Sequence, residues 1–135
     1  MASTGAHLAN KNAWVYHASK GAGLQMTRCM ALDLSKDGIR VNSVSPAAIW
    51  TQTIGKMVNN DKDFHRTTWG KFHMLKRCGE SAEVAAVVAF LCSRDAGFIT
   101  GADIKVDGGY TTIGPERHGE EVGVKLAVLS KEPKT

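Results

Sequence analysis

The order of helical and strand-like segments is the feature that most constrains the fold of this chain. Residues 13–35 are rich in Ala, Leu, Met and Gln and contain no proline, which predicts a long helix. Residues 39–44 and 101–106 have the composition of short strands, and helical patterns lie between them. Helices that alternate with strands are typical of a parallel sheet. The chain is therefore predicted to belong to the α/β class.

The long helix is predicted to be amphipathic. Its apolar face consists of residues spaced three or four apart: Ala18, Ala22, Met26, Cys29 and Leu32. Gly38 follows the last turn and can adopt the left-handed conformation that often ends a helix.

The second half of the pattern contains a looser region and a strongly apolar helix. Residues 51–79 are predicted to form short helices that act as a mobile cover. Ser81 is predicted to cap the next helix, whose body, residues 84–91, is almost wholly apolar and so expected to be buried on more than one side. Two parallel strands cannot cover helices this apolar, so the pattern indicates part of a larger sheet.

Composition excludes several classes of function. The 135 residues are 43% hydrophobic, and the net charge of +4 comes from scattered basic residues, which disfavours nucleic-acid binding. No stretch approaches the roughly 20 apolar residues of a membrane span. The first residues resemble no signal peptide, so we expect a cytoplasmic location by default.

Cysteine and histidine spacing predicts neither disulfides nor a metal site. Cys29, Cys78 and Cys92 form no metal-binding pattern, and Cys29 and Cys92 are expected to pack as small apolar side chains. Four histidines without ligand neighbours are expected to lie at the surface: His17, His65, His73 and His118.

Tyr16 and Lys20 are the first candidates for catalysis. They lie four positions apart on the long helix, so both side chains emerge on one face. An ammonium group beside a phenol favours the phenolate, and such a tyrosine can exchange a proton with a substrate oxygen. Ser3, thirteen positions before Tyr16, could orient that oxygen. The pair alone is weak support, because exposed helices often carry one by chance.

Further motifs make the pattern specific. Residues 40–51, RVNSVSPAAIWT, resemble the segment N-x-x-x-P-G-x-x-x-T of the short-chain dehydrogenase/reductase family. Residues 101–109, GADIKVDGG, resemble that family's ending G-x-x-x-x-V-D-G-G. With the Ser, Tyr and Lys in matching order, residues 1–112 resemble the C-terminal half of a family domain. Residues 113–135 form a variable tail, for which an added edge strand and disorder both remain open.

The resemblance implies a Rossmann-like, doubly wound parallel sheet and an oxidoreductase. The enzyme would transfer a hydride between NAD or NADP and a small alcohol or ketone. Tyr16 would be the general acid/base, and Ser3 would polarise the substrate oxygen. Lys20 would bind the nicotinamide ribose and favour the phenolate of Tyr16.

The same resemblance assigns cofactor-binding residues. Beside Tyr16 and Lys20 they are Pro46, Ala47, Ile49 and Thr51, which would line the nicotinamide. Ile49 would offer backbone bonds to its carboxamide and Thr51 its hydroxyl. Trp69, Phe72 and Met74 would either contact substrate or simply pack.

Two departures from the family qualify these expectations. Ala47 replaces the usual glycine, so a positive φ at this position would be strained. The 135 residues contain no T-G-x-x-x-G-x-G turn for the pyrophosphate, which a gene-model truncation, a splice form or a fragment would each explain. These residues alone are therefore expected to be inactive.

Two functional hypotheses follow. In the first, this segment supplies catalysis and substrate cover to an oxidoreductase. In the second, it is an inactive remnant that associates with related subunits. The family's long helix and final strand commonly form subunit contacts, which implies a homo-oligomer in the complete protein.

Overall fold

The computed structural model describes residues 1–114 and consists of four helices and four short strands in that range. The helices are α1 (Trp14–Leu34), α2 (Gln52–Met57), α3 (Lys62–Trp69) and α4 (Ser81–Cys92). The strands are β1 (Ser43–Pro46), β2 (Ile49–Trp50), β3 (Gly79–Glu80) and β4 (Asp103–Val106). The tail predicted for residues 113–135 lies almost wholly outside the described residues.

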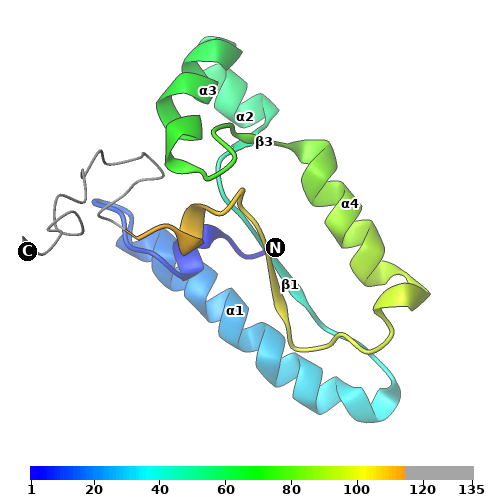
Figure 1. Ribbon diagram of the computed structural model, residues 1–135. Helices are drawn as coiled ribbons and strands as arrows, with labels where there is room; N and C mark the ends of the chain where they lie inside the picture. Colours follow the sequence, from blue (N-terminus) through cyan, green and yellow to red (C-terminus); the bar gives the residue numbers. More distant parts are fainter. Residues whose placement is uncertain (115–135) are drawn as a thin grey trace, which may run out of the picture.

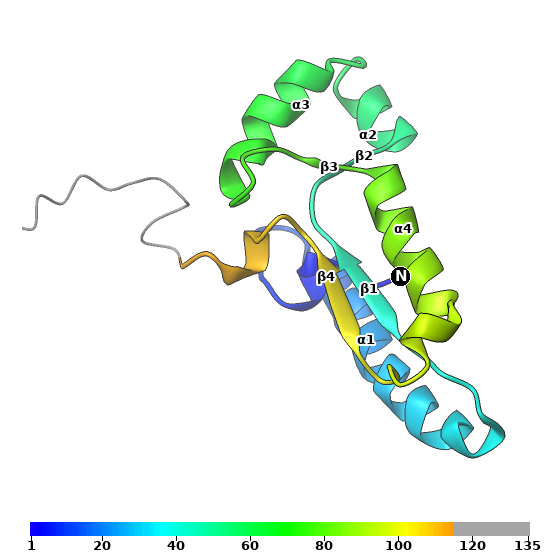
Figure 2. The same cartoon turned by 45° about the vertical axis from the view of Figure 1, so that its right-hand side comes forward.

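Strands β1 and β4 form the central pair. They run parallel, in a register that places Ser43 opposite Asp103 and Pro46 opposite Val106. The N-terminal segment also bonds to β1, because the Ala2 amide donates to the Val44 carbonyl at 2.9 Å. Helices α1 and α4 lie on opposite sides of this pair (Figures 1 and 2). This arrangement confirms the predicted α/β class with parallel strands.

The first predicted strand was placed too early in the chain. Residues 40–42 approach the segment before β4 and bond to it mainly through side chains; a backbone bond also runs from the Gly101 amide to the Val41 carbonyl at 2.7 Å. The Arg40 guanidinium donates to the carbonyls of Leu91 (2.7 Å) and Ile99 (3.0 Å), at and beyond the end of α4. The Asn42 amide donates to the Ile99 carbonyl at 2.8 Å. The parallel ladder therefore begins only at Ser43.

The main apolar core lies between the β1–β4 pair and α4. Its buried members are Val44, Val84, Leu91 and Ala96, and partly buried residues surround them: Ile49, Val87, Ile99, Ile104 and Val106. Full burial of a Val or Leu side chain such as Val44, Val84 or Leu91 contributes about 1.5–3 kcal/mol to stability.

The predicted apolar face of α1 is not its buried face. Leu24, Thr27 and Ala31 are buried, whereas Leu32 is 77% exposed and Cys29 is exposed. Thr27 tolerates burial because its hydroxyl donates to the Gly23 carbonyl at 2.9 Å. No element among the described residues covers the predicted face.

Helix α4 also differs from its prediction. It buries Val84 and Leu91 on one side only, while Phe90 is 46% exposed and Cys92 is exposed. The expectations that Cys29 and Cys92 pack inside and that α4 is buried on several sides are therefore wrong for the described chain.

Helix ends follow ordinary capping chemistry. Gly38 has φ 72°, the left-handed conformation predicted for it. The predicted cap of α4 is wrong by one residue, because Glu80 and Glu83 form a reciprocal capping box. Ser81 instead donates its hydroxyl to the Trp50 carbonyl at 2.8 Å.

The predicted short helices of the cover are confirmed as α2 and α3. The sequence did not predict β2 and β3, which pair in parallel over only two residues each. Arg77 fixes the end of the cover to α4 through two bonds to Glu83, at 2.6 and 2.8 Å.

No helix in residues 1–114 combines the length and apolar character needed to cross a membrane.

Candidate active site

Ser3, Tyr16 and Lys20 meet at one cavity. Ser3 precedes a short 3₁₀ turn, Thr4–Ala6, while Tyr16 and Lys20 lie in the first two turns of α1. All three line a cavity of about 870 Å³ between the β1 end, the cover and α4. The fold thus brings together the three residues predicted for catalysis.

Tyr16 and Lys20 have the relation expected from their spacing. The Lys20 Nζ lies 5.6 Å from the centre of the Tyr16 ring, so the cation faces the π system. The same Nζ donates to the Met1 carbonyl at 3.4 Å. Tyr16 is 49% exposed, which leaves its ring accessible to a ligand.

The Ser3 hydroxyl is held in place by one hydrogen bond, and its proton remains available for another. Its oxygen accepts a hydrogen bond from the Gly5 amide at 3.1 Å. That contact occupies a lone pair of the oxygen, so the hydroxyl proton can be donated to a group in the cavity. The turn is tightly packed, because a Cβ on Gly5 would lie 2.9 Å from Cε1 of Tyr16.

Three of the predicted nicotinamide-lining residues share this cavity, and one does not. Pro46, Ala47 and Ile49 line it. Thr51 does not line it; its hydroxyl oxygen caps α2 by accepting from the Ile54 amide at 3.2 Å.

The strain expected at Ala47 is not found. Among residues 1–114, the residues other than glycine with positive φ are Asn12, Asn59, Asn60 and Lys76. The Ala47 amide donates to the Val106 carbonyl at 3.4 Å, which extends the β1–β4 ladder by one residue. An alanine is therefore compatible with this turn.

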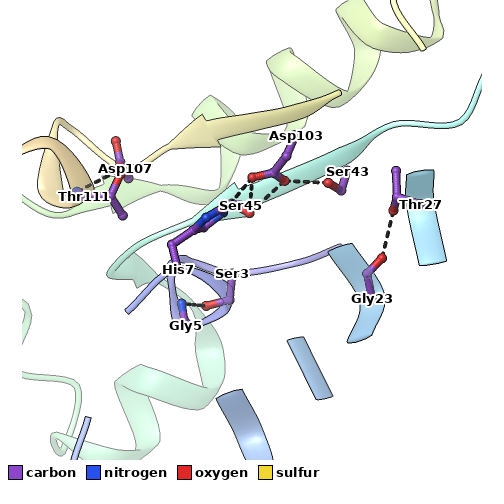
Figure 3. A network of polar contacts seen from close by, with 10 residues as sticks. All are labelled: Ser3, Gly5, His7, Gly23, Thr27, Ser43, Ser45, Asp103, Asp107 and Thr111. Carbon is purple, nitrogen blue, oxygen red and sulfur yellow. Dashed lines mark hydrogen bonds and ion pairs between the residues drawn. The ribbon is translucent and has the colours of Figure 1, made fainter. Parts of the chain in front are cut away.

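A polar network ties the Ser3 turn to the sheet (Figure 3). Asp103 accepts hydrogen bonds from the Ser43 hydroxyl (2.5 Å), the Ser45 hydroxyl (2.8 Å) and His7 Nε2 (2.8 Å). Burial opposes ionisation of Asp103, but these three donors outweigh it and hold the pKa of the carboxyl below its ordinary value. No local motif marks this network, since its members lie far apart in the chain.

Asp107 has a related role in the V-D-G-G turn. Its carboxylate accepts from the Thr111 amide at 2.9 Å and from the Thr111 hydroxyl at 2.6 Å (Figure 3). It also accepts from the Gly109 amide at 3.0 Å. Burial raises the pKa of Asp107, yet these bonds more than offset it and leave the pKa low. The motif therefore encodes a turn that Asp107 stabilises.

His65 belongs to the wall of the cavity, contrary to the surface position predicted for it. It is only 3% exposed and packs between the rings of Trp50 and Trp69, with ring centres 5.3 and 5.0 Å away. Burial lowers its pKa, against a smaller opposing effect of Glu80. Its spacing of four from Trp69, on one helix face, was the available sequence signal.

The other aromatic, methionine and histidine residues named in the cover do not all reach the cavity. Trp69 lines the cavity, whereas Phe72 and Met74 do not. The surface position predicted for His73 is wrong, because it is 3% exposed and donates from Nδ1 to the Trp69 carbonyl at 2.9 Å. His118 lies outside the described residues.

Comparison with known proteins identifies the family. A family model described as "Enoyl-(Acyl carrier protein) reductase" matches residues 1–111. A short chain dehydrogenase family protein from Francisella tularensis is 39% identical, with a TM-score of 0.74 over 83% of this chain and 49% of its own. This chain belongs to the short-chain dehydrogenase/reductase family. The resemblance inferred from the motifs is thereby confirmed.

Two further relatives extend the comparison. The meso-2,3-butanediol dehydrogenase of Serratia marcescens is 48% identical over 96 residues, which cover 71% of this chain and 37% of that protein. A gluconate 5-dehydrogenase from Burkholderia cenocepacia, solved in complex with NADP and tartrate, is 28% identical with a TM-score of 0.74, over 84% of this chain and 44% of its own. The chain thus spans less than half the length of these relatives.

Proposed function

We propose that this chain supplies part of the active site of an oxidoreductase that interconverts a small alcohol and its carbonyl compound. This part, the catalytic corner, consists of Ser3, Tyr16 and Lys20. The observation that carries the proposal is the convergence of Ser3, Tyr16 and Lys20 on one cavity. A nicotinamide cofactor, NAD or NADP, supplies or accepts the hydride when bound. The residues of this chain manage the accompanying proton.

Each of the three side chains has a distinct task. The Tyr16 hydroxyl gives a proton to the substrate oxygen during reduction and removes it during oxidation. The Lys20 ammonium, 5.6 Å from the Tyr16 ring, stabilises the phenolate that forms on donation. The Ser3 hydroxyl donates a hydrogen bond to the same substrate oxygen and fixes its direction.

The cavity wall next to these residues fits the nicotinamide. Pro46, Ala47 and Ile49 present small or apolar surface to one side of the cavity, as a flat ring requires. In this proposal Lys20 would bind a ribose hydroxyl of the cofactor. Thr51 would reach the carboxamide only through the hydroxyl proton that its capping bond leaves free.

The rest of the cavity favours a small substrate with limited polarity. Apolar side chains from the cover and α4 dominate its wall: Ile54, Trp69, Val84, Ala85, Val88 and Ala89. A secondary alcohol or ketone with short carbon substituents matches a wall of this kind around a polar corner. The diol named for the Serratia marcescens relative belongs to this class.

A second candidate function is subunit association without catalysis. It is favoured by the large apolar side chains on the outer side of α1, where Trp14 is 83% exposed and Val15 75%. Such surface is typical of an interface, and a second copy of a family chain is the partner that we propose.

The deciding assay uses the longest natural polypeptide that carries these 135 residues. We expect it to reduce NAD or NADP in the presence of a panel of secondary alcohols and diols. A fusion that places the N-terminal part of the Serratia marcescens relative before Met1 serves as the second sample. Turnover by the fusion but not by the natural polypeptide would support the association function. Inactivity of a folded, cofactor-binding fusion would contradict the catalytic proposal.

Lys20→Met tests the electrostatic part of the proposal. The substitution keeps an apolar stem but removes the charge that stabilises the phenolate, so the oxidation rate should fall. Cofactor affinity should also weaken. Steady-state rates across pH and a cofactor titration measure both effects, with Lys11→Met as the exposed control. Profiles identical to the parent protein would remove Lys20 from the mechanism.

A further inference from the structure

His17 follows Tyr16 directly in the chain and contacts the turn that carries Ser3. Its Nδ1 lies 2.5 Å from the Gly5 carbonyl oxygen, and its Nε2 lies 3.1 Å from the Asn10 amide nitrogen. The ring is partly buried and meets the Tyr16 ring edge-on, with 5.8 Å between ring centres. The surface role predicted for His17 therefore misses these two contacts.

The two partners specify one protonation form of the ring. A carbonyl oxygen can only accept a hydrogen bond, so Nδ1 carries a proton. A backbone amide can only donate, so Nε2 carries none. Both bonds exist together only in the neutral ring with its proton on Nδ1.

These bonds fix the turn at two points. Gly5 also donates its amide to the Ser3 hydroxyl, so its peptide groups link Ser3 on one side to His17 on the other. A Cβ on Gly5 would lie 2.9 Å from Tyr16 and 3.0 Å from His17, which shows how closely the turn sits against both rings. Asn10 fixes the return of the chain toward α1.

We propose that His17, in this neutral form, is a positioning residue that sets the Ser3 hydroxyl relative to the Tyr16 hydroxyl. The inference rests on the proposed function, in which both hydroxyls act on one substrate oxygen. His7 holds the same turn to the sheet through Asp103, while His17 holds it to α1. The distance between the two catalytic hydroxyls is thus set from the helix side by His17.

Three variants of the longest natural polypeptide separate the two bonds. His17→Asn places an amide donor near the position of Nδ1, and His17→Gln places an amide acceptor near the position of Nε2. His17→Phe keeps the ring but removes both bonds. We expect His17→Phe to lower kcat by roughly tenfold to a hundredfold with little change in cofactor KM, because small displacements of catalytic groups are costly. His17→Asn should recover more of kcat than His17→Gln, since the Gly5 contact is nearer Ser3.

A double-mutant cycle tests whether the effect passes through Ser3. In a Ser3→Ala background, His17→Phe should reduce kcat by less than about twofold, because the group that it positions is already absent. Lys11→Ala, an exposed change in the same segment, is the control and should leave kcat unchanged. Full additivity of the Ser3 and His17 effects would overturn the positioning role.

A readout independent of activity tests the contacts themselves. Nitrogen NMR of histidine-labelled protein should show His17 as the neutral form protonated on Nδ1, and the Asn10 amide should exchange slowly with solvent. His17→Phe should accelerate that exchange. A His17 ring protonated on Nε2, or an unprotected Asn10 amide in the parent protein, would overturn the inference. Where the natural polypeptide is inactive, the kinetic variants are made in the fusion. A fusion that is also inactive, with these NMR signatures present, would instead contradict the proposed function and any catalytic task for His17.

Discussion

The catalytic corner and the outer faces of α1 and α4 differ in how completely the described residues satisfy their side chains. The polar network that ties the Ser3 turn to the sheet supports the corner: Ser45 is fully buried and Asp103 accepts hydrogen bonds from three side chains. On the outer faces, Leu32 of α1 is 77% exposed and Phe90 of α4 is 46% exposed. The corner therefore depends on contacts that the described residues supply themselves. The outer faces require another surface before their apolar side chains contribute to stability.

The largest expected effect concerns the 135 residues expressed alone. They should turn over no alcohol or ketone and bind neither NAD nor NADP tightly, because the sequence contains no glycine-rich turn for the pyrophosphate. The exposed apolar faces should also cause aggregation or binding of a hydrophobic dye. Calorimetry with both cofactors and a thermal melt measure these properties on one sample. Micromolar cofactor binding with a cooperative melt would contradict this expectation.

A smaller effect is expected from the polar corner. In the longest natural polypeptide, Asp103→Ala should reduce the free energy of unfolding by about 2–4 kcal/mol, because it leaves Ser43, Ser45 and His7 without their acceptor. Lys105→Ala, an exposed change on the same strand, should cost less than about 0.5 kcal/mol. Denaturant unfolding measures both. Equal losses would show that the Asp103 network does not organise the corner.

The smallest expected effects are two pH windows in stability. Burial lowers the pKa of His65 from 6.5, so the unfolded chain binds its proton more readily and stability should decline as pH falls below 6.5. His65→Leu should remove that decline. A second decline should follow between about pH 4.5 and 2, where three carboxylates with lowered pKa take up protons: Glu83 (pKa about 2), Asp103 and Asp107. Chemical denaturation across pH checks both windows, and a slope unchanged in His65→Leu would reject the first.

Local patterns predicted the parts of the fold that depend on neighbouring residues. The helix over residues 13–35, its end at Gly38 and the short helices of the cover all follow from propensity and capping. The parallel arrangement of β1 and β4 followed from the order of elements. The motifs also grouped Ser3, Tyr16 and Lys20, and the fold places all three at one cavity.

The errors concern contacts between distant parts of the chain. The segment before β1 is held by Arg40, which donates to carbonyls 51 and 59 residues later, and no local pattern carries that information. The buried face of α1 was misjudged because hydrophobicity favoured Leu32 over Thr27, while the fold buries Thr27 and satisfies its hydroxyl internally. His17 and His65 were assigned to the surface because neither has metal-ligand neighbours in the sequence. The spacing of His65 from Trp69 was the one sign of its burial, whereas the partners of His17 lie outside its helix.

The most direct test of the central claim is Tyr16→Phe in the longest natural polypeptide, or in the fusion where that polypeptide lacks a pyrophosphate-binding turn. The substitution removes one hydroxyl at the cavity and leaves α1 intact. We expect the rate of hydride transfer, measured by the absorbance of the reduced nicotinamide, to fall by about a hundredfold or more. The fold and the cofactor affinity should be preserved. Tyr110→Phe, at the other tyrosine, is the matched control and should leave the rate unchanged. Undiminished hydride transfer in Tyr16→Phe would contradict the claim that this corner is the active site.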